Sequence, residues 1–180
     1  LGAFGDAGAA TTGRPDLAKQ IEKLRDHGRE GKYSHTALGY NERMDGIQGA
    51  VLDIKLDYLD NWNEGRRENA DFYNEALESL PVTTPTVREQ AEHIYHQYAI
   101  RCPRRDEVIE KLHEADIGAG IHYPIPLHLQ ESLSGLNYES GDFPEAEKAA
   151  NEVLSLPVFS DLTDQQLEYV VEQLTEALEN

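Results

Sequence analysis

Three segments decide the fold class: HIYHQYAIRC at residues 93–102, RDEVIEKLHEA at 105–115 and GAGIHYP at 118–124. The first is rich in Tyr and Ile and predicts a strand, and the third predicts a second short strand. The middle segment is amphipathic, because Val108, Ile109 and Leu112 recur at helical spacing. The order strand, helix, strand predicts an α+β domain.

The residues that follow predict turns and then two helices. Residues 124–144 contain Pro, Gly, Ser and Asn at close intervals and predict a long stretch of turns. PEAEKAANEVLSL at 144–156 predicts a helix, and Thr163 or Asp164 is expected to cap the last helix. The apolar positions of that last helix are Leu167, Val170, Val171, Leu174 and Leu178.

The first 41 residues have a different composition. LGAFGDAGAATTG at 1–13 is small and rich in glycine and predicts a strand with a tight turn. Pro15 and Asp16 suit the first turn of a short helix that ends near His27. Residues 28–41 contain three glycines and predict a loop.

One long helix is expected from Asn41 towards Pro81. Its apolar residues lie on more than one face, which predicts burial on two sides, one of them a contact with another subunit or domain. We therefore divide the chain into residues 1–41, a part of another domain, and residues 42–180, the α+β domain.

The charge excludes two classes of partner. The chain has 180 residues, 34 of them acidic and 16 basic, for a formal net charge of -18. Nucleic acids and anionic membranes are bound through Lys and Arg, so neither is expected as a partner. No apolar run is long enough to cross a bilayer, no secretory signal is present, and Cys102 is the single cysteine. These features predict a protein of the reducing cytoplasm.

Several possible sites can be weighed from the residues alone. His93 and His96 would point to opposite faces of a strand, which disfavours a shared metal ion. His122 and Tyr123 before Pro124 are either a polar pair at a cleft or an ordinary strand end. The Gly2, Gly5 and Gly8 spacing does not match a dinucleotide fingerprint.

The arginine clusters leave two interpretations open. Arg66 and Arg67, like Arg101 to Arg105, are either partners in surface ion pairs or a local binding site for an anionic substrate. No G-x-S-x-G motif is present to support hydrolase chemistry.

Five segments taken together resemble the DegT/DnrJ/StrS family of pyridoxal-phosphate-dependent sugar aminotransferases. They are LGAFGDAGAATT, LRDHG, GKYSHTALGYNERMDGIQGAVL, HIYHQYAIR and GIHYPIPLHLQ, in this order. The resemblance implies the α+β C-terminal small domain of a fold type I transferase, with a remnant of the large cofactor-binding α/β domain at residues 1–41.

The resemblance also implies where the chemistry resides. The lysine that forms the Schiff base lies two residues before the LGAFGD segment in the family, so we expect it upstream of Leu1, together with the carboxylate that pairs with the pyridine nitrogen. None of the six lysines of this chain has the required context. We therefore expect this chain to be inactive alone.

The remaining site residues follow by motif. Asn41 and Arg43 match residues at the cofactor phosphate and the subunit interface of a homodimer. His122, Tyr123 and His128 match positions on the sugar-nucleotide side of the cleft, and His96 is a further candidate there.

The implied reaction transfers an amino group from glutamate to a nucleotide-linked keto-sugar through pyridoxamine phosphate. Two alternatives remain open: a deoxysugar dehydratase of the same family, in which histidine replaces the lysine, and a structural or regulatory module without cofactor. The acidic surface does not help an anionic substrate to bind, and with 6 Lys against 10 Arg we interpret it as a halophilic adaptation.

Overall fold

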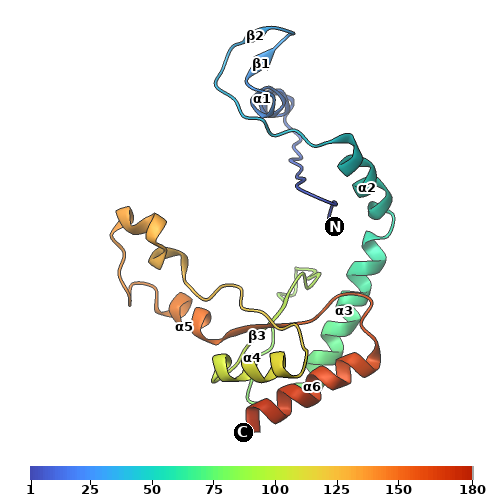
Figure 1. Ribbon diagram of the computed structural model, residues 1–180, viewed down its shortest axis with the longest axis vertical. Helices are drawn as coiled ribbons and strands as arrows, with labels where there is room; N and C mark the ends of the chain where they lie inside the picture. The colour runs from blue at the N-terminus through green and yellow to red at the C-terminus, as the bar shows by residue number, and fades with distance from the viewer. Residues whose placement is uncertain (180) are drawn as a thin grey trace. The chain divides into compact units, whose positions relative to one another are not determined.

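The computed structural model describes residues 1–179, which form two compact units. The first unit is Leu1–Asp60, and the described part of the second unit is residues 61–179 (Figure 1). The expected domain boundary near residue 41 concerns the whole enzyme and stays a prediction. No helix of residues 1–179 is long and apolar enough to span a membrane.

The first unit contains helices α1 (Pro15–Arg25) and α2 (Gly46–Leu56) and a small hairpin of β1 (Arg29–Glu30) and β2 (Ser34–His35). Helix α1 begins at a proline with Asp16 in its first turn and ends with Lys23 and Arg25, charges that suit the helix dipole. The helix predicted from Pro15 is confirmed.

The hairpin lies within residues 28–41, where a loop was expected. Its strands are antiparallel, with Arg29 opposite His35. Gly28 has a φ of 65°, and a Cβ at this position would lie 1.9 Å from the carbonyl oxygen of Ala37. Only glycine permits this close approach, because it has no Cβ. Gly28, one of the glycines that predicted a loop, therefore allows two chain segments to cross in contact.

Residues 1–13 form no strand with any residue of the range 1–179, so the predicted strand is wrong for the described chain. A strand requires a hydrogen-bonded neighbour, whereas this segment is held by side chains of α2. Gln48 accepts a hydrogen bond from the Phe4 amide at 2.8 Å, and Lys55 donates to the carbonyl of Gly2 at 2.7 Å.

The long helix expected from Asn41 is two helices, α2 and α3 (Leu59–Ala76). Asn41 instead forms an isolated bridge with Asp26, and the helix begins five residues later. Helix α2 ends where the Tyr58 amide donates to the carbonyl of Lys55, a tightened turn that interrupts the α-helical ladder. Helix α2 has no buried residue, so burial on two sides is not observed within the described chain.

The core of the second unit lies between one strand pair and three helices. Strand β3 (Tyr98–Arg101) pairs antiparallel with β4 (Val153–Leu156), and helices α3, α4 (Arg105–Glu114) and α6 (Asp164–Glu179) bury their apolar faces. Helices α4 and α6 lie side by side (Figure 1). The largest fully buried side chains are Tyr73, Leu77, Tyr98, Ile100, Leu112, Leu154 and Leu174.

The strand, helix, strand prediction is correct for β3 and α4 but wrong for the third segment. Residues 118–124 contribute only a bridge between Gly120 and Ser155, and the partner of β3 comes from residues predicted to be helical. Helix α5 (Pro144–Glu152) ends at Glu152, and Val153 continues directly into β4. Pairing with the distant β3 overrides the local helical pattern here.

Between α4 and α5 the chain forms the 3-10 turns η1 (Leu127–Leu129) and η2 (Glu131–Leu136), as the turn-rich composition predicts. Helix α6 is capped by Thr163. The Thr163 hydroxyl accepts from the Gln166 amide at 3.3 Å, and Gln166 Oε1 accepts from the Thr163 amide at 3.0 Å.

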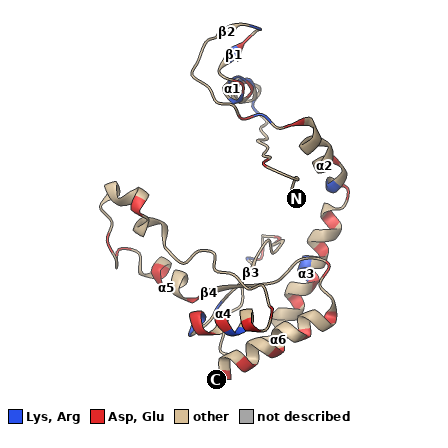
Figure 2. Cartoon of the chain, in the orientation of Figure 1, with Lys and Arg blue, Asp and Glu red and all other residues tan. Residues whose placement is uncertain are grey.

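The outer face of α6 carries an acidic row, consisting of Asp164, Glu168, Glu172 and Glu176 at intervals of four residues. All four are exposed. Figure 2 shows acidic residues along this helix and no basic ones.

Candidate functional site

His122 lies between two hollows of the second unit. The first hollow, which we call the apolar pocket, has a volume of about 440 Å³ and is lined by Tyr123, by Pro124 to Leu127 and by the alanines of α5. Tyr123 itself is 73% exposed. His122 and Tyr123 form a polar wall of the apolar pocket, and Gln130 adds one further polar side chain to the lining.

The second hollow, which we call the Arg66 pocket, has polar side chains on one part of its lining and Leu156, Val158 and Phe159 on another. Its polar side chains are Arg66, His96, Gln97, His122 and Ser155, and its volume is about 440 Å³. The backbone of residues 118–120 forms one side. The structure thus brings His96 and His122, which the resemblance indicated in two separate motifs, to the same pocket.

The His122 ring is fixed from two sides. Its Nδ1 lies 3.1 Å from the hydroxyl of Ser155, which is itself buried. A Cβ at Gly120 would lie 2.9 Å from His122 Cε1, so a side chain there would displace the ring. These contacts hold the imidazole at the junction of the two pockets.

His128 is placed differently from the other predicted histidines. Its side chain is only 8% exposed, and its Nε2 donates to Glu147 Oε1 at 3.1 Å. The ring also lies 4.8 Å from that of Phe143, centroid to centroid. These two contacts fix the orientation of the imidazole, which suits a residue that positions the chain.

Glu147 of α5 accepts hydrogen bonds from the turn that precedes this helix. Its carboxylate accepts from the Gly141 amide at 2.8 Å and from the Ser140 hydroxyl at 3.0 Å, in addition to His128. The Gly141 amide is the largest cause that holds the pKa of Glu147 below its ordinary value, and Ser140 and His128 act in the same direction against partial desolvation. The neighbouring Ala146 and Ala149 line the apolar pocket.

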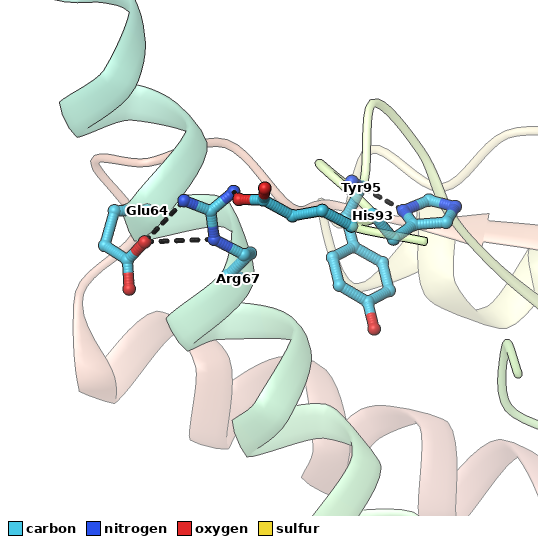
Figure 3. Close-up of polar contacts among 5 residues, drawn as sticks. Glu64, Arg67, His93 and Tyr95 are labelled. Atoms are coloured by element: carbon cyan, nitrogen blue, oxygen red, sulfur yellow. Dashed lines mark hydrogen bonds and ion pairs between the residues drawn. The ribbon is translucent and has the colours of Figure 1, made fainter. Parts of the chain in front are cut away.

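His93 does not share a site with His96. Its Nδ1 accepts a hydrogen bond from the Tyr95 amide at 2.7 Å, and its ring lies 4.3 Å from that of Tyr95 (Figure 3). Residues 93–97 precede β3 and are not a strand. The histidines are therefore separated by a local turn at Tyr95, whose φ is 46°, and not by the alternation of a strand.

The ion-pair interpretation of the arginine clusters is confirmed for every member except Arg66. Arg67 forms ion pairs with Glu64 at 2.5 Å and Glu92 at 2.7 Å, and Figure 3 shows its guanidinium beside the carboxylate of Glu64. Arg66, one residue earlier, donates instead to backbone carbonyls and lines a pocket. In the second cluster the recorded ion pairs are Arg101 with Glu152, Arg104 with Glu107 and Arg105 with Asp106.

Asn41 and Arg43 lie together in the first unit. Arg43 Nε donates to Asn41 Oδ1 at 3.0 Å, and both residues are exposed. Arg43 also lines a hollow with Arg25, and the lining of this hollow includes the carboxylates of Asp6 and Glu42. An amide nitrogen beside a guanidinium is a donor set that fits a phosphate group.

Three residues of this region were not selected from the sequence as site residues, namely Arg66, Ser155 and Glu147. The contacts of Arg66 and Ser155 come from residues far along the chain, so no local pattern reports them. The one available signal was that Arg66 stands in a short basic cluster of a very acidic chain.

The model of the DegT/DnrJ/EryC1/StrS aminotransferase family matches residues 1–175. A pleiotropic regulatory protein of Geobacillus stearothermophilus is 45% identical over 179 residues, which is 98% of this chain and 48% of that protein. The dTDP-3-amino-3,4,6-trideoxy-alpha-D-glucose transaminase of Streptomyces venezuelae is 39% identical over 98% of this chain and 47% of its own length. The chain spans about half the length of these curated relatives.

Solved structures give the same result. The crystal structure of S. venezuelae DesV in complex with a ketimine intermediate superposes with a TM-score of 0.95 at 39% identity and covers 100% of this chain and 49% of DesV. The fold expected from the sequence is thus that of sugar aminotransferases. The chain belongs to the DegT/DnrJ/EryC1/StrS aminotransferase family.

Proposed function

We propose that the protein containing this chain transfers an amino group from glutamate to a keto-sugar linked to a nucleotide, with pyridoxal phosphate as cofactor. The observation that supports this most is the match of the whole chain to DesV, together with nucleotide-sugar aminotransferases among its relatives. The lysine that would hold the cofactor is proposed to lie outside these 180 residues, so the chain alone is expected to be inactive.

The cofactor phosphate is proposed to bind at Asn41 and Arg43. Their neighbouring amide and guanidinium fit an anion, and both are exposed. When bound, pyridoxal phosphate supplies the electron sink that allows an amino group to pass to a keto carbon. This chain is proposed to act as part of a homodimer, which the exposed apolar side chains of α2, such as Ile47 and Ile54, support.

The sugar is proposed to contact His122 and Tyr123 at the polar wall of the apolar pocket. His122 can donate or accept a proton at a sugar hydroxyl from a ring that Ser155 holds in place. His128 is proposed to position this wall through Glu147. Such positioning by protein contacts limits the loss of orientation when substrate binds.

The function is tested on the full-length protein. A cofactor absorbance that borohydride abolishes, and the appearance of an amino-sugar nucleotide when glutamate and a keto-sugar nucleotide are added, are the expected results. A full-length protein that never binds the cofactor would contradict the proposal. That outcome would favour a regulatory module, a possibility raised by the name of the Geobacillus relative.

The role of Asn41 has its own test. Asn41→Ala is expected to raise the Kd for pyridoxal phosphate about tenfold, because it removes a hydrogen bond to a charged group. Equilibrium dialysis of the full-length protein measures this constant. Asn151→Ala, a change of an exposed asparagine on α5, is the matched control. Equal cofactor retention in both variants would refute the phosphate role.

A further inference from the structure

No acidic side chain of residues 1–179 lines the Arg66 pocket. Three further hollows of the described chain do contain carboxylates, namely Glu22 and Glu30, Asp6 and Glu42, and Glu114 and Glu176. In a chain with 34 acidic residues, a hollow that holds an arginine and no carboxylate is a favourable place for an anion. Its polar side chains are one guanidinium, two imidazoles, an amide and a hydroxyl.

The guanidinium of Arg66 has no carboxylate partner within residues 1–179. Its Nη1 donates to the carbonyls of Tyr95 at 3.2 Å, His96 at 3.4 Å and Val158 at 3.4 Å. These contacts orient the guanidinium. All three hydrogen bonds come from Nη1, so the N–H groups of Nε and Nη2 remain as donors for a ligand. The positive charge is thus held at the pocket without an ion pair.

The two imidazoles add donors without adding acid. His122 turns Nδ1 towards the hydroxyl of Ser155, which leaves its Nε2 for a ligand. His96 is exposed at the pocket, and its side chain makes no recorded hydrogen bond within the described chain. A guanidinium and imidazole N–H groups together form a donor set for a carboxylate or a phosphate.

The charge of the whole chain makes such a site necessary for an anionic ligand. A surface of net charge -18 repels anions at long range, so an anionic group binds only where the local potential is reversed. We propose that the Arg66 pocket binds an oxyanion, the carboxylate of the amino donor or a phosphate of the nucleotide. This assignment deepens the proposed function and rests on it for the identity of the ligand.

His122 connects this site to the apolar pocket, because it lines both. A ligand with its oxyanion at Arg66 would place its uncharged part towards His122 and Tyr123. The Arg66 pocket therefore adds an anchoring role to the substrate contacts proposed above.

The test introduces a negative charge into the pocket. His96→Glu makes the protein more acidic by one charge, and Lys148→Gln, on the exposed part of α5, changes the net charge equally without touching a pocket described here. Both variants are prepared as full-length protein loaded with cofactor. Inorganic phosphate is titrated at constant ionic strength, and NMR signals of histidines labelled at Cε1 report its binding.

Phosphate is expected to shift the His96 and His122 signals in the parent protein. In His96→Glu we expect the phosphate affinity measured at the His122 signal to fall about tenfold. In Lys148→Gln we expect this affinity to stay within about twofold of the parent value. The absence of a phosphate response at both histidines, or an equal loss in both variants, would overturn the proposal. This readout does not depend on turnover, so it stands even if no aminotransferase activity is found.

The source of the oxyanion is separated by steady-state kinetics on the same variants. A raised KM for glutamate in His96→Glu, with the KM for the nucleotide sugar unchanged, supports the donor carboxylate. The reverse pattern supports the nucleotide phosphate. An active His96→Glu protein in which neither KM moves would overturn the pocket's role while leaving the proposed function intact.

Discussion

Glu147 is the residue through which the turn at residues 139–143 is fastened to α5. Three groups donate to one carboxylate, and they come from the Gly141 backbone, the Ser140 side chain and the His128 ring. Tyr138 extends the cluster by an edge contact with Phe143 at 5.1 Å between ring centroids. One carboxylate therefore joins both the turn at residues 139–143 and His128 to α5.

The first prediction concerns that charge. Glu147→Gln is expected to lower the hydrogen-exchange protection of the Gly141 amide several-fold, because a charge-assisted hydrogen bond becomes a neutral one. The folded pKa of Glu147 is lowered, so the stabilisation is present above the ordinary value of 4.5 and is lost as the pH falls through the folded pKa.

Protection factors measured by NMR across this pH range check both statements. Glu145→Gln serves as the control, because Glu145 lies two residues earlier on α5 and is exposed. Protection of Gly141 that is equal in the two variants would contradict the fastening role of Glu147.

Cys102 gives a second prediction at this scale. The thiol is 1% exposed, and burial raises its pKa to about 11. Because the thiolate is the reactive form, iodoacetamide at pH 8 is expected to leave Cys102 unmodified in the native protein and to alkylate it in guanidinium. Peptide mass mapping identifies the modified residue, and equal labelling in both states would be the contrary result.

Among the elements, α6 depends most clearly on apolar burial. Leu174 is fully buried between this helix and the rest of the core. Leu174→Ala is expected to reduce the free energy of unfolding by about 2–5 kcal/mol, because it removes transfer energy and leaves a cavity. Urea unfolding measures the change.

The neighbouring Glu172 supplies the comparison for this prediction. It is exposed on the same helix, and Glu172→Ala is expected to change the stability by less than about 0.5 kcal/mol. Similar losses in the two variants would mean that α6 contributes little to the core.

The sequence predicted the elements whose signals are local. Helices α1 and α6 have a proline or a capping threonine at the start, and α4 has clear apolar periodicity. Strand β4 was missed because Val153 follows the last residue of α5 with no turn residue between them. Only β3, far away in the chain, makes these four residues a strand.

The site follows the same division. His96, His122 and Tyr123 are marked by their motifs, and the structure places them around two adjoining pockets. Arg66 acquires its orientation from carbonyls 29 and 92 residues away, which no local pattern encodes. Their roles in binding stay predictions.

At the scale of the whole molecule, repulsion between acidic side chains opposes the folded state. The chain carries a net charge of -18, and the acidic row of α6 places like charges at the i, i+4 spacing that destabilises a helix. The described chain can relieve this repulsion only in part, because basic side chains are less than half as numerous as acidic ones.

We therefore expect the melting temperature of the full-length protein to rise with KCl up to molar concentrations, because salt screens exposed charges. Differential scanning calorimetry in a KCl series measures this. Sucrose solutions of matched viscosity control for effects other than screening. A melting temperature that is flat or falls with salt would count against a halophilic adaptation.

The pairing of β3 with β4 also constrains how the second unit is made on the ribosome. Tyr98 lies opposite Leu156 and Arg101 opposite Val153, so β3 leaves the exit tunnel long before its partner has been synthesised. Contacts this distant in the chain form late. Tyr98 and Ile100 are fully buried in the finished protein, but in the nascent chain β4 is not yet present to cover them. Exposed apolar strands in incomplete chains are prone to aggregate. We therefore expect the nascent chain to need protection by chaperones most in the interval between the synthesis of these two strands.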